Sequence, residues 1–206
     1  RLYDYQPSRG GFHAEEFLKG FSGYLICDGF SGYNKLKGVI RCGCLAHMRR
    51  YWKEALPGKT RKSSDKTPAE IGLNYCNQLF ELEKEYADLD ADTRKAERLE
   101  TEPAIWEAYW SWLETVNPAG GSRLAKAVTY AKNQKPYMEN YLLDGRCSIS
   151  NNIAENIAYI STEIEAVKAA CSAATLLKRR MAKLVILSAL IRITQNGIRL
   201  GCLLKL

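Results

Sequence analysis

The spacing of apolar residues changes at Pro57, and this change constrains the fold more than any other feature of the sequence. Before it, apolar runs at 24–27 and 39–45 are typical of strands, and 46–56 has the spacing of an amphipathic helix. Beyond it, from 69 to 141, apolar residues recur almost only at helical spacing. The sequence therefore predicts an α/β core with a large all-helical insertion.

Smaller elements precede the change. Residues 1–6 have strand character, 14–21 place apolar side chains on one helical face, and 33–36 are expected to form a helical turn. We divide the chain into 1–56 as the first part of the core, 57–145 as the helical insertion, and 146–206 as a C-terminal helical part of the core.

Prolines and aromatic residues organise the predicted insertion. Pro103 is expected in the first turn of a helix, and Pro136 is expected to begin a short segment after a helix at 124–133. The aromatic residues at 106–112 resemble a platform for stacking bases. Aromatic residues at helical spacing more commonly form a core, and we adopt that interpretation.

Seven cysteines bear on redox state and on metal binding. Their odd number and their spacing fit no disulfide framework, so we expect reduced thiols. Cys42, Cys44 and His47 resemble half of a zinc site, but a four-ligand site requires a second Cys/His pair, and His13 is the other histidine in the chain. Buried strand cysteines are the preferred interpretation.

Charge and hydropathy indicate the class of partner. The net charge is +7, with basic ends and an acidic middle: 1–56 carries nine Lys and Arg against five Asp and Glu, and 157–206 carries eight against two. Such ends suit a polyanion such as DNA, although a solvated basic surface has the same composition. The longest apolar run, 184–193, is too short to span a membrane, so no membrane partner is expected.

Two carboxylates stand in positions suited to metal chemistry. Asp28 follows a predicted apolar strand and precedes Gly29, and that end of a strand is where open α/β sheets bind ligands. Glu155 falls about one turn inside a helix that Ser150 or Asn151 would cap. A turn aspartate and a glutamate that stabilises a helix N-terminus would occupy the same positions.

Metal-assisted phosphoryl transfer would give both carboxylates a function. Two cations roughly 3.5–4 Å apart can activate the attacking oxygen and stabilise the leaving oxygen. Mg²⁺ prefers oxygen ligands and keeps several waters, so a few carboxylates suffice to hold it. The spacing of Asp28 and Glu155 in the sequence does not establish that they meet.

Four motifs, in order, resemble the catalytic region of transposases of the insertion sequence 66 family. They are LYDYQPSR at 2–9, FSGYLICDGFSGY at 21–33, RCGCLAHMRR at 41–50 and SNNIAEN at 150–156. The resemblance covers about residues 1–156 and includes 81–140 as the helical insertion of the family.

The resemblance implies a DDE-type DNA transposase with an RNase H-like core. Asp28 would be its second acidic residue and Glu155 its glutamate, both ligands of Mg²⁺ or Mn²⁺. The first acidic residue is expected upstream of Arg1. The resemblance further implies that His47, Arg49 and Arg50 contact DNA or the active-site carboxylates, although a basic helix at the surface would carry the same residues. Asn152 is implied as another contact to DNA.

The implied reaction is strand cleavage and strand transfer at transposon ends. Its partners would be transposon-end and target DNA and further copies of the chain, in the bacterial cytoplasm and at the nucleoid when DNA is bound.

Two departures from the family pattern shape the expectations for this chain. The first acidic residue is absent, and the basic segment that usually follows the glutamate is replaced at 157–180. We hypothesise a rearranged or frameshifted coding sequence there, which reading the other frames would test. We expect the chain as given to be inactive in strand transfer, and the alternative function is an inactive remnant that binds DNA or another transposase subunit.

Overall fold

The computed structural model describes residues 8, 10–58 and 65–152. The described residues fall into two compact units, which we treat separately. One contains 10–21 and 31–37, and the other contains 22–30 and most of 38–151. The expected strand at 1–6 and Glu155 lie outside the described residues.

The described part of the first unit contains one short helix and one 3-10 helix. Helix α1 spans Gly11–Phe17 and η1 spans Ser31–Lys35. The expectation of a helix at 14–21 was wrong at its end, because Gly20 adopts a φ of +77° that a right-handed helix cannot accommodate. The expected helical turn at 33–36 is present as η1.

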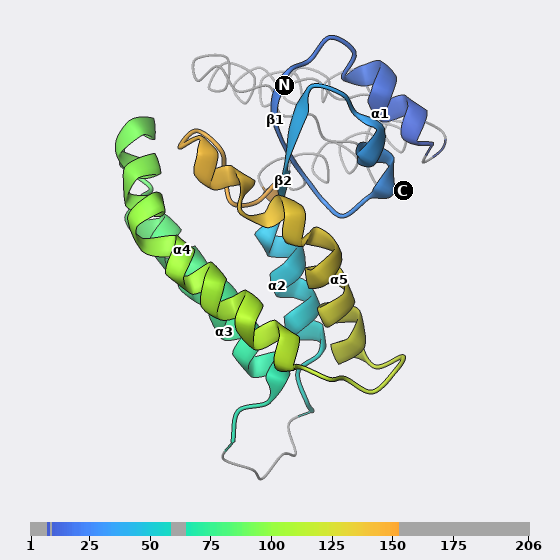
Figure 1. Cartoon of the computed structure of the whole chain (residues 1–206), viewed down its shortest axis with the longest axis vertical. Helices are drawn as coiled ribbons and strands as arrows, with labels where there is room; N and C mark the ends of the chain where they lie inside the picture. Colours follow the sequence, from blue (N-terminus) through green and yellow to red (C-terminus); the bar gives the residue numbers. More distant parts are fainter. Residues whose placement is uncertain (1–7, 9, 59–64, 153–206) are drawn as a thin grey trace, which may run out of the picture. The chain divides into compact units, whose positions relative to one another are not determined.

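A small parallel sheet and one helix begin the second unit. Strand β1 (Gly23–Cys27) pairs in parallel with β2 (Val39–Gly43), with Gly23 opposite Val39 and Cys27 opposite Gly43. Helix α2 (Leu45–Glu54) follows β2 after Cys44 alone. Both strands and the helix were predicted from the sequence, although β2 ends at Gly43 rather than at residue 45. The described chain is thus mixed α/β and mostly helical (Figure 1).

Three long helices and one 3-10 helix follow in the second unit. Helix α3 (Pro68–Glu85) begins with a capping box, in which Thr67 accepts from the Glu70 N–H and Glu70 accepts from the Thr67 N–H. Asp90 caps α4 (Ala91–Thr115) and Ser122 caps α5 (Arg123–Met138). A 3-10 helix, η2 (Asn140–Leu143), ends the series.

Two expectations about prolines were wrong. Pro103 lies inside α4 and Pro136 lies inside α5, where each was expected near the beginning of an element. A proline in a helix leaves one carbonyl, four residues earlier, without its usual donor. Those carbonyls belong to Leu99 and Lys132, and both residues are exposed, so water can replace the missing donor. Both helices therefore continue through their prolines.

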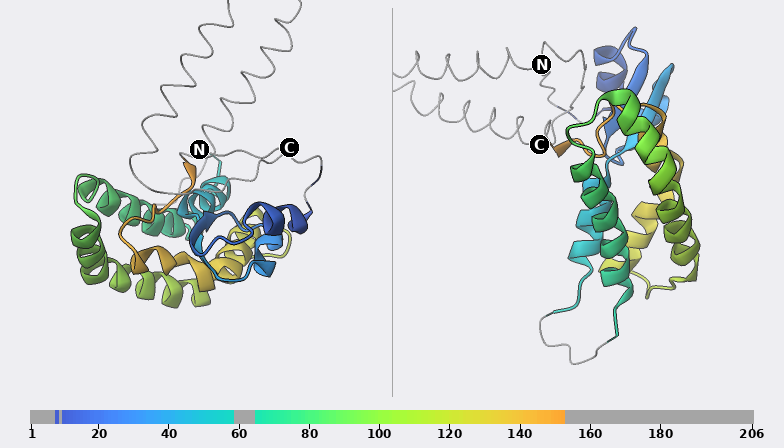
Figure 2. Two further views of the ribbon diagram at one scale, coloured as in Figure 1. Left: turned by 90° about the horizontal axis from the view of Figure 1, so that it is seen from above. Right: turned by 90° about the vertical axis from the view of Figure 1, so that its left-hand side faces the viewer.

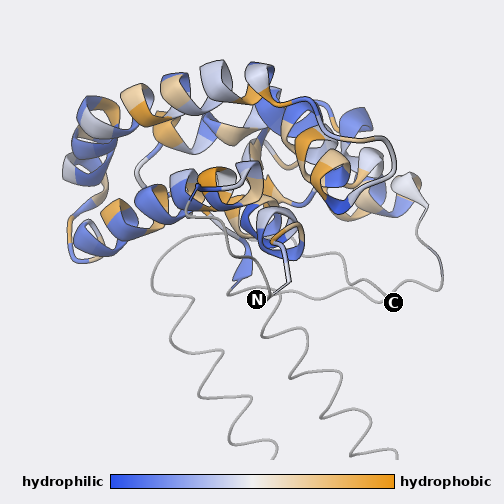
Figure 3. Ribbon diagram, turned by 90° about the horizontal axis from the view of Figure 1, so that it is seen from below, coloured by the Kyte–Doolittle hydropathy of each residue, from blue (hydrophilic) through white to orange (hydrophobic). Residues whose placement is uncertain are grey.

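The helices of the second unit pack around a dense aromatic core. Helix α2 packs against both α3 and α5, and α3 packs against α4 (Figures 1 and 2). Trp52, Trp106 and Tyr109 are at most 1 % exposed, and the rings of Trp106 and Trp110 stack 5.4 Å apart. Each helix carries both hydrophobic and hydrophilic residues, as expected for helices with one buried face (Figure 3). The interpretation of residues 106–112 as core is confirmed for these aromatics.

Across the described residues, no helix combines the length and the apolar character that a membrane span requires.

Candidate active site at the carboxyl edge of the strands

Asp28 follows β1 directly, at the carboxyl edge of the parallel pair. Its Oδ1 accepts a hydrogen bond from the Phe30 N–H at 3.1 Å, which closes a tight turn through Gly29. The side chain is half-buried. Because β1 and β2 are parallel, the end of β2 lies at the same edge, and side chains that follow either strand can converge there.

The N-terminus of α2 lies at this edge. The Cys44 N–H donates to the Cys27 carbonyl at 3.1 Å, which ties the residue after β2 to the last residue of β1. His47, in the first turn of α2, donates its N–H to the Cys44 carbonyl at 3.2 Å and is 4 % exposed. Asp28 and His47 are therefore both anchored close to the Cys27–Cys44 contact.

The segment that returns from the helices also reaches this edge. The Leu45 N–H donates to the Ile149 carbonyl at 3.0 Å, and the Asn151 N–H donates to the Cys44 sulfur at 3.5 Å. Asn151 is 8 % exposed. Two motifs that lie about a hundred residues apart in the sequence, around Cys44 and around Asn151, thus meet beside the end of the sheet.

Helix α5 contacts the turn that carries Asp28. A Cβ atom placed on Gly29 would lie 2.9 Å from Cε2 of Tyr130 and 3.0 Å from Nε2 of Gln134. The Tyr130 ring also stacks on Tyr51 of α2, with centroids 4.5 Å apart. The absence of a side chain at Gly29 therefore allows α5 to pack directly against the residue after Asp28.

Four cysteines surround this edge as buried free thiols: Cys27, Cys42, Cys44 and Cys147. Burial raises the pKa of Cys27 to about 11, which opposes formation of the thiolate that binds metals. Within the described part of the chain, no three His, Cys, Asp or Glu residues are grouped as metal ligands. The interpretation of Cys42 and Cys44 as buried cysteines, each 0 % exposed, is confirmed.

The other predicted site residues have different surroundings. Arg49 donates from Nε to Oδ1 of Asn77 at 2.7 Å, so it packs on α3, whereas the Arg50 side chain is 50 % exposed. Asn152 is exposed. Contact of His47, Arg49, Arg50 and Asn152 with DNA stays a prediction, as does the role of Glu155.

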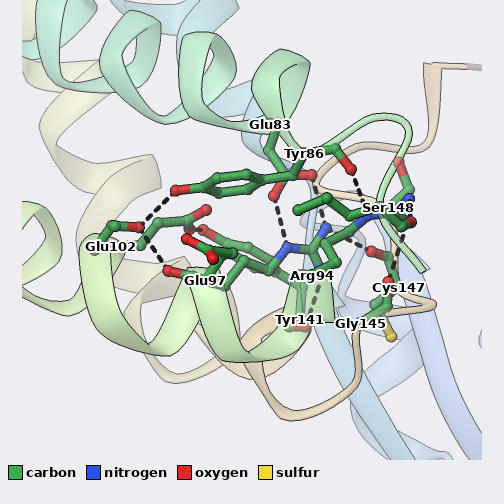
Figure 4. A network of polar contacts seen from close by, with 12 residues as sticks. Glu83, Tyr86, Arg94, Glu97, Glu102, Tyr141, Gly145, Cys147 and Ser148 are labelled. Atoms are coloured by element: carbon green, nitrogen blue, oxygen red, sulfur yellow. Dashed lines mark hydrogen bonds and ion pairs between the residues drawn. The ribbon is translucent and has the colours of Figure 1, made fainter. Parts of the chain in front are cut away.

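A buried polar network holds the return segment in place. Arg98 of α4, 1 % exposed, pairs with Glu83 of α3 and donates to the Cys147 carbonyl at 3.0 Å. Arg94 donates to the Gly145 carbonyl at 3.2 Å, and the Tyr141 hydroxyl donates to Glu102 (Figure 4). The helical insertion thereby fixes the chain that leads to Asn151.

Sequence reasoning did not identify Tyr130, Gln134 or Arg98. Tyr130 and Gln134 lie four residues apart, so they share one face of α5, and a glutamine on a largely apolar helical face is a signal that was available. Arg98 carried no comparable signal, because its acceptors come from residues up to 49 positions away.

Comparisons with known proteins agree with these motifs. The family model described as "Transposase IS66 family" matches residues 1–158 of the chain. An uncharacterized protein of Sinorhizobium fredii, y4qI, is 30% identical over 166 residues, which are 74% of this chain and 30% of that protein. A second, y4hP of the same organism, is 26% identical over 170 residues, 75% of this chain and 31% of that protein.

The chain therefore spans less than a third of the length of these relatives. No solved structure is significantly similar to the chain. The family match covers more than half of the sequence and includes both the Asp28 and the Cys44 motifs, and the chain belongs to the IS66 family of transposases.

Proposed function

We propose that this chain forms part of the catalytic core of a DNA transposase, which cleaves and transfers strands at transposon ends by metal-dependent phosphoryl transfer. One observation carries the proposal: the turn after β1 places Asp28 at the sheet edge where the Cys44 and Asn151 motifs converge. In open α/β sheets such an edge is the usual place for a ligand.

The proposed core is RNase H-like. Its first part is 1–56, with β1, β2 and α2 in it, its insertion is 57–145, and its last part is 146–206. Two observations support this division. The strands are parallel and followed closely by a helix, and the helical segment returns to the end of β2 through the Leu45–Ile149 bond.

Asp28 and Glu155 are the proposed ligands of Mg²⁺ or Mn²⁺. The surroundings of Asp28 fit a hard cation, because the carboxylate is half-buried and the buried oxygens of Tyr130 and Gln134 have no hydrogen-bond partner among the described residues. A bound cation would polarise the phosphoryl oxygen and lower the pKa of an attacking water. Asp28 would hold this cation beside the reacting groups.

DNA is the proposed partner, and exposed Arg50 is the best-placed cation of α2 to meet a phosphate. His47, Arg49 and Asn152 are further proposed contacts to DNA. Because two DNA ends must be joined, the working form is proposed to be a homo-oligomer, in the bacterial cytoplasm and at the nucleoid when DNA is bound.

Titration of the full chain with Mn²⁺ tests the proposal. Asp28→Ala and Glu155→Ala should each abolish specific binding, whereas Asp88→Ala, a change at an exposed aspartate, should leave it intact. Binding that is indifferent to both changes would overturn the metal site. Binding of a fluorescein-labelled DNA duplex without any metal site would instead favour the second function, a remnant that only holds DNA.

A further inference from the structure

Two polar side chains of α5 meet the turn that follows Asp28. Gln134 and Tyr130 approach Gly29 so closely that a Cβ there would lie 3.0 Å from the Gln134 amide nitrogen and 2.9 Å from the Tyr130 ring. Gln134 is 6 % exposed. Helix α5 belongs to the predicted insertion, so the insertion contributes directly to the surroundings of Asp28.

The oxygens of these two side chains lack partners. Oη of Tyr130 and Oε1 of Gln134 are buried, and neither forms a hydrogen bond with any residue that the structure describes. An unpaired buried polar atom costs roughly 1–3 kcal/mol, and native proteins contain few of them. A partner other than the described residues would satisfy these two oxygens.

A hydrogen-bond donor is the partner that suits both oxygens. The phenol oxygen of Tyr130 can accept a hydrogen bond as well as donate one. The amide oxygen of Gln134 can only accept. A water molecule on a hydrated cation is a strong donor, and Mg²⁺ keeps several such waters when it binds to one or two carboxylates.

We propose that Tyr130 and Gln134 accept hydrogen bonds from the water ligands of a divalent cation at Asp28 and thereby position that cation. This inference rests on the proposed function, because it requires a cation at Asp28. The two residues do not touch the ion themselves. They act on its waters, as outer-sphere groups commonly do when they orient a metal site.

Mn²⁺ binding to the full chain, followed by electron paramagnetic resonance, provides the test. Gln134→Met keeps the length of the side chain and removes its acceptor, and Tyr130→Phe removes only a hydroxyl. Each change should weaken Mn²⁺ binding about tenfold. Tyr86→Phe is the matched control, because the Tyr86 hydroxyl bonds to Thr101 instead, and it should leave Mn²⁺ affinity unchanged.

Stability separates this role from a structural one. Since Oε1 of Gln134 has no partner, Gln134→Met should leave the thermal unfolding midpoint unchanged or raise it, while Mn²⁺ affinity falls. Gln134→Glu keeps an acceptor and adds a charge, so it should bind Mn²⁺ at least as tightly as the wild type.

The outcomes distinguish the two proposals. This inference is overturned if Gln134→Met and Tyr130→Phe both bind Mn²⁺ with wild-type affinity while Asp28→Ala loses binding. The proposed function would then still stand. Absence of Mn²⁺ binding in the wild type, or equal binding in Asp28→Ala, would overturn both.

Discussion

Arg98 and Glu83 form a two-pronged ion pair between α4 and α3, with Nε to Oε1 at 2.6 Å and Nη2 to Oε2 at 2.7 Å. The Arg98 side chain is 1 % exposed and that of Glu83 is 13 % exposed. The same guanidinium donates to the Cys147 carbonyl, so one side chain joins two helices to the segment that leads toward the candidate site.

Arg98→Met should destabilise the chain strongly. The change leaves Glu83 partly buried without its cation and removes the donor to Cys147, and breaking a buried pair in this way costs about 3–5 kcal/mol. Urea unfolding measures the loss. Lys84→Met is the matched control, because its pair with Glu81 is 70% and 65% exposed and should contribute less than about 1 kcal/mol. Equal losses in the two variants would contradict the role given to Arg98.

Glu102 should make stability depend on pH. Burial raises the pKa of Glu102 to about 7 from 4.5, and its Oε1 has no partner among the described residues. Tyr141, Glu83 and Arg98 are the titratable groups that face it. The folded state therefore binds the proton more tightly, so this stabilisation is complete below the unfolded pKa and is lost as pH rises through about 7.

The protonation of Glu102 contributes at most about 3 kcal/mol to the free energy of unfolding. In the wild type, the denaturant midpoint should fall as the pH rises from 4.5 to 7, the interval between the unfolded and the folded pKa of Glu102. Glu102→Gln should flatten the dependence, because it stays neutral throughout. A variant with the same slope as the wild type would assign the dependence to other groups.

The elements near the strands were predictable because their signals are local. Residues 24–27 and 39–43 alternate or run apolar between turns, and α2 carries its apolar face at helical spacing. Pro103 and Pro136 misled the prediction, because a proline usually marks a helix start, whereas here the exposed neighbours tolerate the missing hydrogen bond.

The surroundings of Asp28 could be predicted only in part. Its place after a strand followed from the local pattern, and the meeting with the Asn151 motif was implied only by family resemblance. The approach of Gln134 to Gly29 depends on how α5 packs over a hundred residues later in the chain. Spacing in a sequence does not report such packing, because the angle between helices is set by the side chains at their contacts.

Gly72→Ala should destabilise the chain although alanine favours helices. In an open helix this change would stabilise by about 1 kcal/mol. Here the new Cβ would lie 2.5 Å from Cδ2 of Trp52, which is fully buried, and overpacking of this kind costs roughly 1–3 kcal/mol. Thermal unfolding should show a loss for Gly72→Ala, whereas Gly120→Ala, with open space around it, should be neutral or slightly stabilising.

Cys147 should be the most reactive of the buried thiols that the structure describes. Cys42 donates a hydrogen bond to Cys147, which lowers the pKa of Cys147 and raises that of Cys42. Burial raises the pKa of Cys76. Native labelling with iodoacetamide in mildly alkaline buffer, followed by peptide mapping, should modify Cys147 before Cys42 and Cys76. Faster labelling of Cys76 would contradict this order.

Arg49 and Arg50 offer a matched pair for separating DNA binding from packing. Arg49 bonds to Asn77 and lies 5.9 Å from the Phe80 ring centroid, so Arg49→Gln should cost about 1–2 kcal/mol of stability. Arg50 is half exposed and 4.0 Å from Glu54, so Arg50→Gln should leave stability within about 0.5 kcal/mol.

If Arg50 meets a phosphate, its loss should weaken binding of a fluorescein-labelled duplex and reduce the salt slope by about one. Unfolding curves and anisotropy titrations at several salt concentrations measure both effects, and an unchanged slope in Arg50→Gln would remove this arginine from the proposed DNA contacts.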